Sequence, residues 1–220
     1  MINDKLGAPN SSFFAPYILH FAFYIFNFSE VLPLIRAFIA VNLASPTIEE
    51  IAKVRSFLRE AQGDIRWTRR EGLHLTLKFL GDIERSQVEL ILAAMRETMR
   101  KWPPLHILAR GLGAFPSLRR PRVLWVGLSG EGLREISEAL ETALMPLDFP
   151  PEEREFTPHL TLGRVRSLRG WEHVLAVVKE YEQTRFGEST VDQVTLYQSE
   201  LRPDGAVYSP LGSVPLQQSS

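Results

Sequence analysis

A four-residue string, His-Leu-Thr-Leu, occurs twice in the chain, at residues 74–77 and 159–162. In a β-strand alternate residues point to the same face, so each copy would carry an imidazole and a hydroxyl on one face and two leucines on the other. Histidine gives and takes protons near neutral pH because its ordinary pKa is about 6.5. Two such strands facing each other would therefore supply a general acid, a general base and two hydroxyls that hydrogen-bond phosphate oxygens.

The alternative is that each copy is an ordinary strand with two polar residues facing solvent, which is the usual meaning of a single His-x-Thr string. Two identical copies in a chain with only five histidines favour a functional site. A zinc site would need a third ligand, and the motifs bring no carboxylate at ligand spacing. The sequence also lacks a P-loop, a glycine-rich dinucleotide fingerprint and a nucleophile elbow. We therefore expect acid–base catalysis without a metal ion or cofactor.

The composition limits both the location of the protein and its partners. No cysteine occurs among the 220 residues, which excludes disulfides and thiolate chemistry and suits the cytoplasm, where we expect the protein. The formal net charge of −1 argues against a protein that coats nucleic acid, but it leaves room for a local basic patch. Arg119, Arg120 and Arg122 form such a patch and are candidates for contacts to an RNA backbone. A solvated loop is the alternative interpretation of these arginines.

Apolar periodicity predicts the elements that must position the motifs. Residues 73–80 and 157–165 are predicted to be strands that each carry one copy. Thr47 and Glu50 have the spacing of a capping box, which predicts that a helix begins at residues 45–47. Further strands are predicted over 35–42, 65–68, 105–113, 123–128, 191–201 and 207–212, and further helices over 84–101, 131–144 and 170–183. Because strands outnumber helices and several are joined by short links, we expect an α+β fold with antiparallel sheets.

The two ends of the chain are expected to lie outside this fold. Residues 13–28 are strongly apolar and aromatic, but the run is shorter than the roughly 20 residues that a membrane span needs, and Pro16 and Asn27 interrupt it. We interpret residues 1–33 as an apolar N-terminal extension, residues 34–212 as one domain and residues 213–220 as a flexible tail. No stable membrane association is expected, with a membrane-associating segment as the less favoured interpretation.

Five stretches of the sequence resemble one known family, and they occur in that family's order. They are RAFIAVNL (36–43), LHLTLKFLGDI (73–83), GLGAFPSLRRPRVLWVGL (111–128), TPHLTLGRV (157–165) and LYQSELRPDGAVYSPL (196–211). The chain thus resembles the RNA 2′,3′-cyclic phosphodiesterases, also called 2′-5′ RNA ligases, of the 2H phosphoesterase superfamily. The resemblance implies a bilobed, pseudo-symmetric fold in which two antiparallel sheets line a central cleft and the helices lie outside.

The resemblance also implies an activity, which is the opening of a terminal 2′,3′-cyclic phosphate on RNA to leave a 2′-phosphate. Carried onto this sequence, it makes His74 the proton donor and His159 the proton acceptor, while Thr76 and Thr161 hold the phosphate. Arg164, just after the second motif, is a candidate phosphate contact, with a solvated arginine at a strand end as the alternative. The expected partner is RNA with a cyclic phosphate end, such as a tRNA fragment, and we expect a monomer.

Two other functions remain open from the sequence. The same two imidazoles could catalyse the reverse, 2′-5′ joining of RNA ends, or the chain could be an RNA- or nucleotide-binding module without turnover. Trp67, Phe79 and Tyr208 could stack on a terminal base. Core packing is the favoured interpretation of these three aromatic residues.

Overall fold

The computed structural model describes residues 33–202 and 205–217. The chain divides into two compact units, Met1–Pro33 and Leu34–Ser220. The expected apolar extension, residues 1–33, therefore lies outside the described residues except for Pro33. No helix in the described part of the chain is long and apolar enough to cross a membrane.

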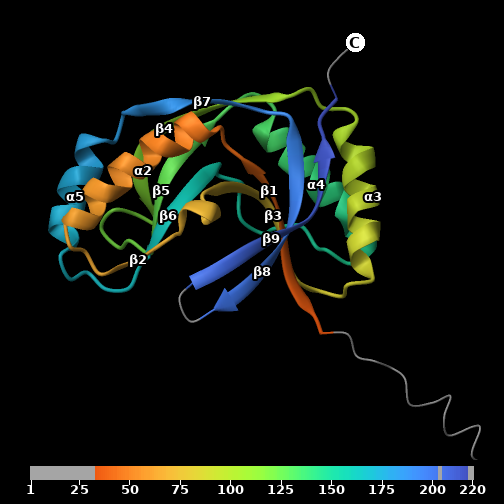
Figure 1. The fold of residues 1–220 in the computed structure, drawn as a ribbon, viewed down its shortest axis with the longest axis horizontal. Helices are drawn as coiled ribbons and strands as arrows, with labels where there is room; N and C mark the ends of the chain where they lie inside the picture. The colour runs from red at the N-terminus through yellow and green to blue at the C-terminus, as the bar shows by residue number, and fades with distance from the viewer. Residues whose placement is uncertain (1–32, 203–204, 218–220) are drawn as a thin grey trace, which may run out of the picture. The chain divides into compact units, whose positions relative to one another are not determined.

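The second unit alternates strands and helices along the chain (Figure 1). Its strands are β1 (Ile35–Asn42), β2 (Ile65–Trp67), β3 (His74–Ile83), β4 (Leu105–Phe115), β5 (Val123–Ser129), β6 (His159–Val165), β7 (Arg185–Val191), β8 (Gln193–Arg202) and β9 (Gly205–Pro215). Its helices are α2 (Ser45–Glu60), α3 (Gln87–Met99), α4 (Leu133–Leu144) and α5 (Trp171–Glu180), with short 3-10 turns η1 (Arg70–Gly72) and η2 (Met145–Leu147). The predicted α+β class is confirmed.

All nine strands belong to one antiparallel sheet, in the order β7-β4-β5-β6-β3-β1-β8-β9, with β2 also paired to β6. The centre of this sheet is narrow, because β3 and β6 are joined by the single pair Leu75 and Leu160. The two sheets expected from the resemblance are therefore two halves of one sheet that meet at the motif strands. In Figure 1, α2 and α5 pack on the half with β7 and β4, and α3 and α4 pack on the half with β3 and β9.

The helices cover their half-sheets with apolar stripes. The stripe predicted in α4 is confirmed, since Leu133, Ile136, Leu140 and Leu144 are all buried. Burial of each such side chain contributes roughly 1.5–3 kcal/mol relative to exposure, which fixes the helix against the sheet. The back of the sheet is therefore a closed core, and polar chemistry is left to the opposite face.

Three predictions about the elements were wrong in detail. Thr47 does not cap a helix: it lies inside α2, and its hydroxyl donates to the carbonyl oxygen of Glu188 in β7, 2.9 Å away. Strand β7, an edge strand, was not predicted, because its two large apolar residues, Phe186 and Val191, are five positions apart and show no alternation with polar residues. Strand β9 runs to Pro215, and the Leu216 amide then donates to the carbonyl oxygen of Asp192. The fold therefore continues past the boundary expected at residue 212.

Candidate active site

The two motif strands meet at the second residue of each strand. Leu75 and Leu160 form the pair that joins β3 to β6, and both are buried. Because the strands are antiparallel, the residues on either side of this pair lie across from each other, which sets His74 toward Thr161 and Thr76 toward His159. All four are half-buried, so the predicted alternation of leucines inside and polar residues outside is confirmed.

His74 lies within a cage of three aromatic side chains from other strands. Its ring stacks on Phe38 of β1 at 4.8 Å between centroids, and the edge of Tyr208 of β9 approaches it at 5.1 Å. Tyr197 of β8 is nearly parallel to it at 6.0 Å. We call Phe38, Tyr197 and Tyr208 the aromatic cage. Because the cage removes water from the imidazole, burial lowers the pKa of His74 to about 4.

His159 has a different environment. Its Nδ1 lies 2.7 Å from the carbonyl oxygen of Thr157, and Phe115 approaches the ring edge-on at 4.9 Å. The carbonyl can only accept, so Nδ1 carries a hydrogen and donates it, which leaves Nε2 of the neutral ring as a proton acceptor. Burial lowers the pKa of His159, and the bond to Thr157 opposes that decrease. The imidazole is thus held in the tautomer that a general base needs.

Both motif strands contain an extra residue at the same position of the motif. In the pairing of β3 with β1, Thr76 and Lys78 face consecutive residues of β1, so Leu77 has no partner. In the pairing of β6 with β5, Thr161 and Gly163 face consecutive residues of β5, so Leu162 has no partner. Such a bulge shifts the alternation by one residue, so the next side chains on the site face are Phe79 and Arg164. The favoured interpretation of Phe79 as a core residue is wrong, since its side chain is 62% exposed.

The bulge also explains the burial of Lys78, which lies two residues after Thr76. Its side chain is buried, forms an ion pair with Glu141 of α4 and donates to the carbonyl oxygen of Pro150 at 2.9 Å. Lys78 therefore connects the first motif strand to α4 and to the segment that leads into β6. Its role is structural, and nothing in the pattern of alternating residues indicates it.

The predicted arginines lie in two places. Arg164 is exposed on the site face of β6. Arg122 is exposed and lies beside the last residue of β6, where its carbonyl oxygen accepts from the Val165 amide at 3.0 Å. Arg119 and Arg120 are exposed on the loop between β4 and β5, at the same end of the half-sheet. The structure thus brings Arg164 to the site, Arg122 to its edge, and leaves the other two on the loop.

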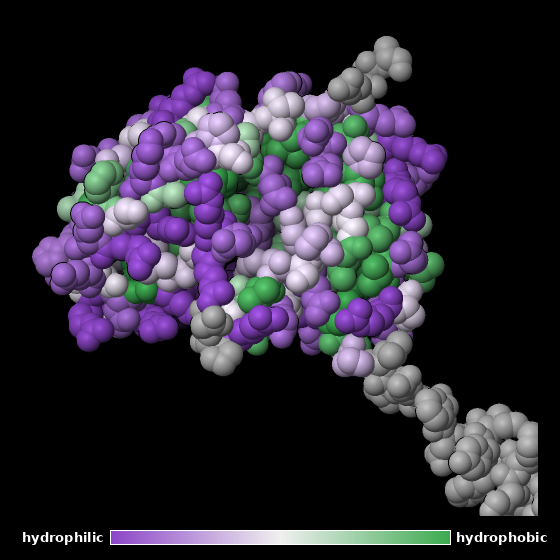
Figure 2. All heavy atoms as spheres, in the orientation of Figure 1, coloured by the Kyte–Doolittle hydropathy of each residue, from purple (hydrophilic) through white to green (hydrophobic). Residues whose placement is uncertain are grey.

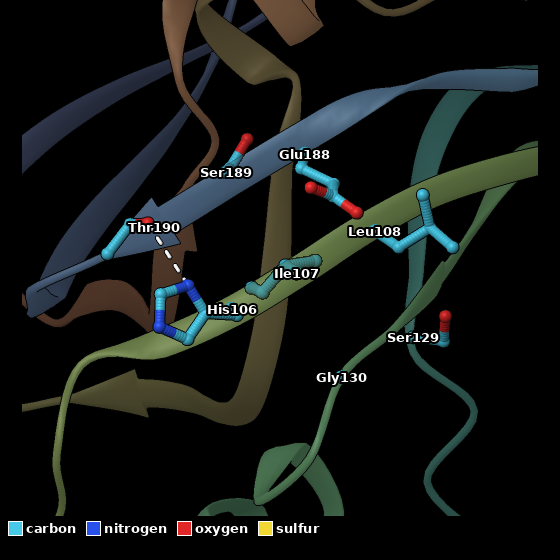
Figure 3. Close-up of a pocket in the computed structure, with 8 residues that line it drawn as sticks. All are labelled: His106, Ile107, Leu108, Ser129, Gly130, Glu188, Ser189 and Thr190. Atoms are coloured by element: carbon cyan, nitrogen blue, oxygen red, sulfur yellow. Dashed lines mark hydrogen bonds between the residues drawn. The ribbon is translucent and has the colours of Figure 1, made fainter.

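A hollow of about 370 Å³ lies elsewhere, lined by the paired strands β4 and β7 and by the end of β5 (Figure 3). His106, Glu188 and Thr190 line it, and His106 Nδ1 is 3.2 Å from the Thr190 hydroxyl. It holds one imidazole and no motif residue, so it lacks the pair of proton-transfer groups that the motif strands provide. Among residues 33–202 and 205–217 no cluster of three or more His, Asp or Glu side chains could hold a metal ion.

Comparison with known proteins shows that one family matches both parts of the chain that contain a motif. The family described as LigT like phosphoesterase matches the chain twice, over residues 41–125 and 126–208, and each match contains one motif. An RNA 2′,3′-cyclic phosphodiesterase of Methanothermobacter thermautotrophicus is 33% identical over 176 residues, covering 80% of this chain and 95% of the relative. One from Archaeoglobus fulgidus is 35% identical over 179 residues, covering 80% and 97%.

Solved structures share the fold. A protein of Thermus thermophilus superposes with a TM-score of 0.72 at 28% identity, over 84% of this chain and all of the other. The Escherichia coli LigT structure with bound 3′-AMP gives a TM-score of 0.69 at 25% identity, over 84% of this chain and 99% of the other. The fold is therefore shared with proteins that have been solved experimentally, in agreement with the family resemblance.

Proposed function

The chain belongs to the LigT-like phosphoesterase family, and from this we propose that it hydrolyses the 2′,3′-cyclic phosphodiester at the end of an RNA to a 2′-phosphomonoester. The observation that carries the proposal is the pairing of Leu75 with Leu160, which sets each motif histidine toward the threonine of the other motif. The arrangement supports acid–base catalysis because it brings two imidazoles and two hydroxyls to one face of the sheet.

The base in this reaction is His159. Its Nδ1 hydrogen is engaged by the carbonyl oxygen of Thr157, so Nε2 is available to take a proton from a water molecule. The water oxygen attacks phosphorus and forms the new P–O bond. A positioned base of this kind typically contributes on the order of 100- to 10,000-fold in rate.

The acid is His74. As the bond between phosphorus and the ribose 3′-oxygen breaks, His74 donates a proton to that oxygen, which becomes the 3′-hydroxyl. The product keeps the phosphate on the 2′-oxygen, and the proton lost by water balances the proton gained by the ribose. His74 ends neutral and His159 ends charged, so one proton must pass between them through solvent before the next turnover.

The remaining groups bind the substrate. The hydroxyls of Thr76 and Thr161 donate to the non-bridging phosphate oxygens, where negative charge increases in the transition state. Arg164 lies on the same face and supplies positive charge to the same phosphate. The exposed ring of Phe79 offers a surface on which the terminal base can stack.

The test is incubation of purified protein with a short RNA that ends in a 2′,3′-cyclic phosphate, in the presence of EDTA. We expect conversion to a 2′-phosphate end, and we expect His74→Ala and His159→Ala to reduce the rate at least 100-fold. His106→Ala is the matched control, because His106 lies in β4 outside both motifs. The proposal is wrong if the cyclic end persists, if joined RNA is the main product, or if both motif variants stay near the wild-type rate.

A further inference from the structure

Two arginines face each other across adjacent strands beside the motif residues. In the antiparallel pairing of β2 with β6, Arg66 lies directly opposite Arg164. Residues in such pairs have Cβ atoms about 5 Å apart, and like charges placed in this way destabilise a sheet. Both side chains are exposed, yet the strands keep the two charges together. The pair is thus unfavourable for folding and well suited to a polyanion.

Arg66 faces the same side of the sheet as the motif histidines. It shares the face of Arg164, which the bulge at Leu162 and Gly163 returns to the side of Thr161. A second observation agrees with this placement. Burial raises the pKa of Tyr208, and the positive charges of Arg164 and Arg66 oppose that rise, so both guanidinium groups lie within electrostatic range of a cage residue that contacts His74.

Within the described ranges 33–202 and 205–217, the side chains of Arg66 and Arg164 form no hydrogen bond and no ion pair. The nearest acidic residue in sequence, Asp64, instead accepts from Ser167 at 2.7 Å and lies 3.9 Å from Arg169. The half of the molecule that carries α2 and α5 in Figure 1 shows a largely hydrophilic surface in Figure 2.

The position of Arg66 along β6 indicates which phosphate it contacts. Trp67 pairs with Gly163 and Leu75 pairs with Leu160, so β2 and β3 follow one line along β6, interrupted by η1. Arg66 therefore continues the line of His74. In the proposed reaction His74 protonates the ribose 3′-oxygen, so the ribose and the chain attached to its 5′-oxygen lie toward this line, whereas Arg164 serves the terminal phosphate.

We infer that Arg66 binds the phosphodiester on the 5′ side of the terminal nucleotide, so that the preferred substrate is an RNA of two or more nucleotides and not a cyclic mononucleotide. This inference rests on the proposed hydrolysis of cyclic ends. A guanidinium suits the role because it stays charged and can donate two parallel hydrogen bonds to one phosphate. The arginines of the β4–β5 loop, Arg119, Arg120 and Arg122, lie at the same end of the half-sheet and extend the positive charge along the RNA.

The experiment compares 2′,3′-cyclic AMP, which has no upstream phosphodiester, with the dinucleotide ApA that ends in a 2′,3′-cyclic phosphate. The measured quantity is the ratio of kcat/KM for the dinucleotide to kcat/KM for the mononucleotide. We expect this ratio to be about ten in the wild type and near one in Arg66→Gln, because a charge-assisted contact is lost. Arg164→Gln should lower both values by a similar factor and leave the ratio near that of the wild type.

Two controls distinguish the loss of a specific contact of Arg66 from a loss of stability and from a general change in net charge. Arg59→Gln removes one positive charge from exposed α2 and should leave the ratio unchanged. The unfolding midpoint of each variant is measured alongside. For the dinucleotide, kcat/KM should depend less steeply on salt concentration in Arg66→Gln than in the wild type, because one ionic contact is lost.

Three results would overturn the inference while leaving the proposed activity intact. They are a wild-type ratio near one, a ratio in Arg66→Gln equal to that of the wild type, and the same loss in Arg59→Gln. If the wild-type protein hydrolyses neither compound, the proposed function itself fails, and the role of Arg66 fails with it.

Discussion

His74 should titrate near pH 4 in the free protein and near neutral pH once a phosphate group lies against it. The aromatic cage buries the imidazole and lowers its pKa to about 4, because a charged ring loses hydration there. At pH 7 only about one molecule in a thousand would then carry the proton that the proposed donor must give. The free protein is therefore in the wrong protonation state for catalysis, and substrate binding has to correct it.

The size of the required correction can be compared with the charge that the substrate brings. For His74 to be half-protonated at pH 7 its pKa must rise by about three units, which corresponds to about 4 kcal/mol. A phosphate monoanion about 4 Å from the ring, at an effective dielectric constant of about 20, stabilises a positive imidazole by about 4 kcal/mol. The phosphate therefore carries enough charge to load its own proton donor.

The assay is an NMR titration of ¹⁵N-labelled histidine side chains between pH 3.5 and 8.5, with and without a saturating nucleoside 2′-phosphate. The His74 signals are assigned by their loss in His74→Gln. We expect the midpoint to move from about 4 to about 7 on ligand binding. Phe38→Ala opens the cage and should raise the midpoint of the free protein toward the ordinary value of about 6.5.

Two outcomes would refute this reasoning. A midpoint between 6 and 7 in the free protein would mean that the aromatic cage does not exclude water from the ring. A midpoint that stays near 4 in the complex would mean that His74 is not the donor at neutral pH, and the assignment of acid and base would have to be reversed.

Three further predictions follow from the same burial and pairing. The free protein must take up one proton to reach the active state, so kcat/KM should fall about tenfold per pH unit between pH 7 and 8. A value of kcat/KM that does not change over this range would contradict the two lowered pKa values. The lowered pKa of His74 also contributes to stability: the contribution is complete above the unfolded pKa of about 6.5 and is lost as the pH falls through 4. In urea unfolding, the wild type should therefore lose about 3 kcal/mol more unfolding free energy than His74→Gln when the pH is lowered over this range. Equal losses in the two proteins would contradict the prediction. Lys78→Met should cost about 3 kcal/mol of unfolding free energy because Glu141 loses its partner. The double variant Lys78→Met/Glu141→Leu should recover most of this loss, and a double variant as unstable as the single one would disprove the prediction.

The strands and helices were predictable wherever the pattern is local. The alternation in the motif strands and the apolar stripe of α4 depend only on neighbouring residues, and both were predicted correctly. Edge strand β7 was missed because one of its faces is open to solvent and its apolar signal is weak. Thr47 was misassigned because its partner, the Glu188 carbonyl oxygen, lies 141 positions away in sequence.

The surroundings of the catalytic candidates were not predictable for a related reason. The aromatic cage around His74 comes from β1, β8 and β9, which approach β3 only through the strand order of the sheet. The two bulges depend on the register of each motif strand with its neighbour, and simple alternation would have placed Lys78 and not Phe79 on the site face. Arg66 became visible only through its pairing with Arg164. Spacing along the chain contains none of this information.

The repeated motif gives two identical strings, but the sheet makes them chemically different. One imidazole is enclosed by aromatic rings and has no carbonyl partner among the described residues, while the other donates through Nδ1 to Thr157 and keeps Nε2 free. After the equivalent bulges, one strand presents Phe79 and the other presents Arg164. An aromatic ring favours a base and a guanidinium favours a phosphate, so a symmetric pair of strands becomes a site with a direction. In the proposed reaction this asymmetry would favour one orientation of a terminal nucleotide, with its ribose 3′-oxygen toward His74 and the attacking water toward His159.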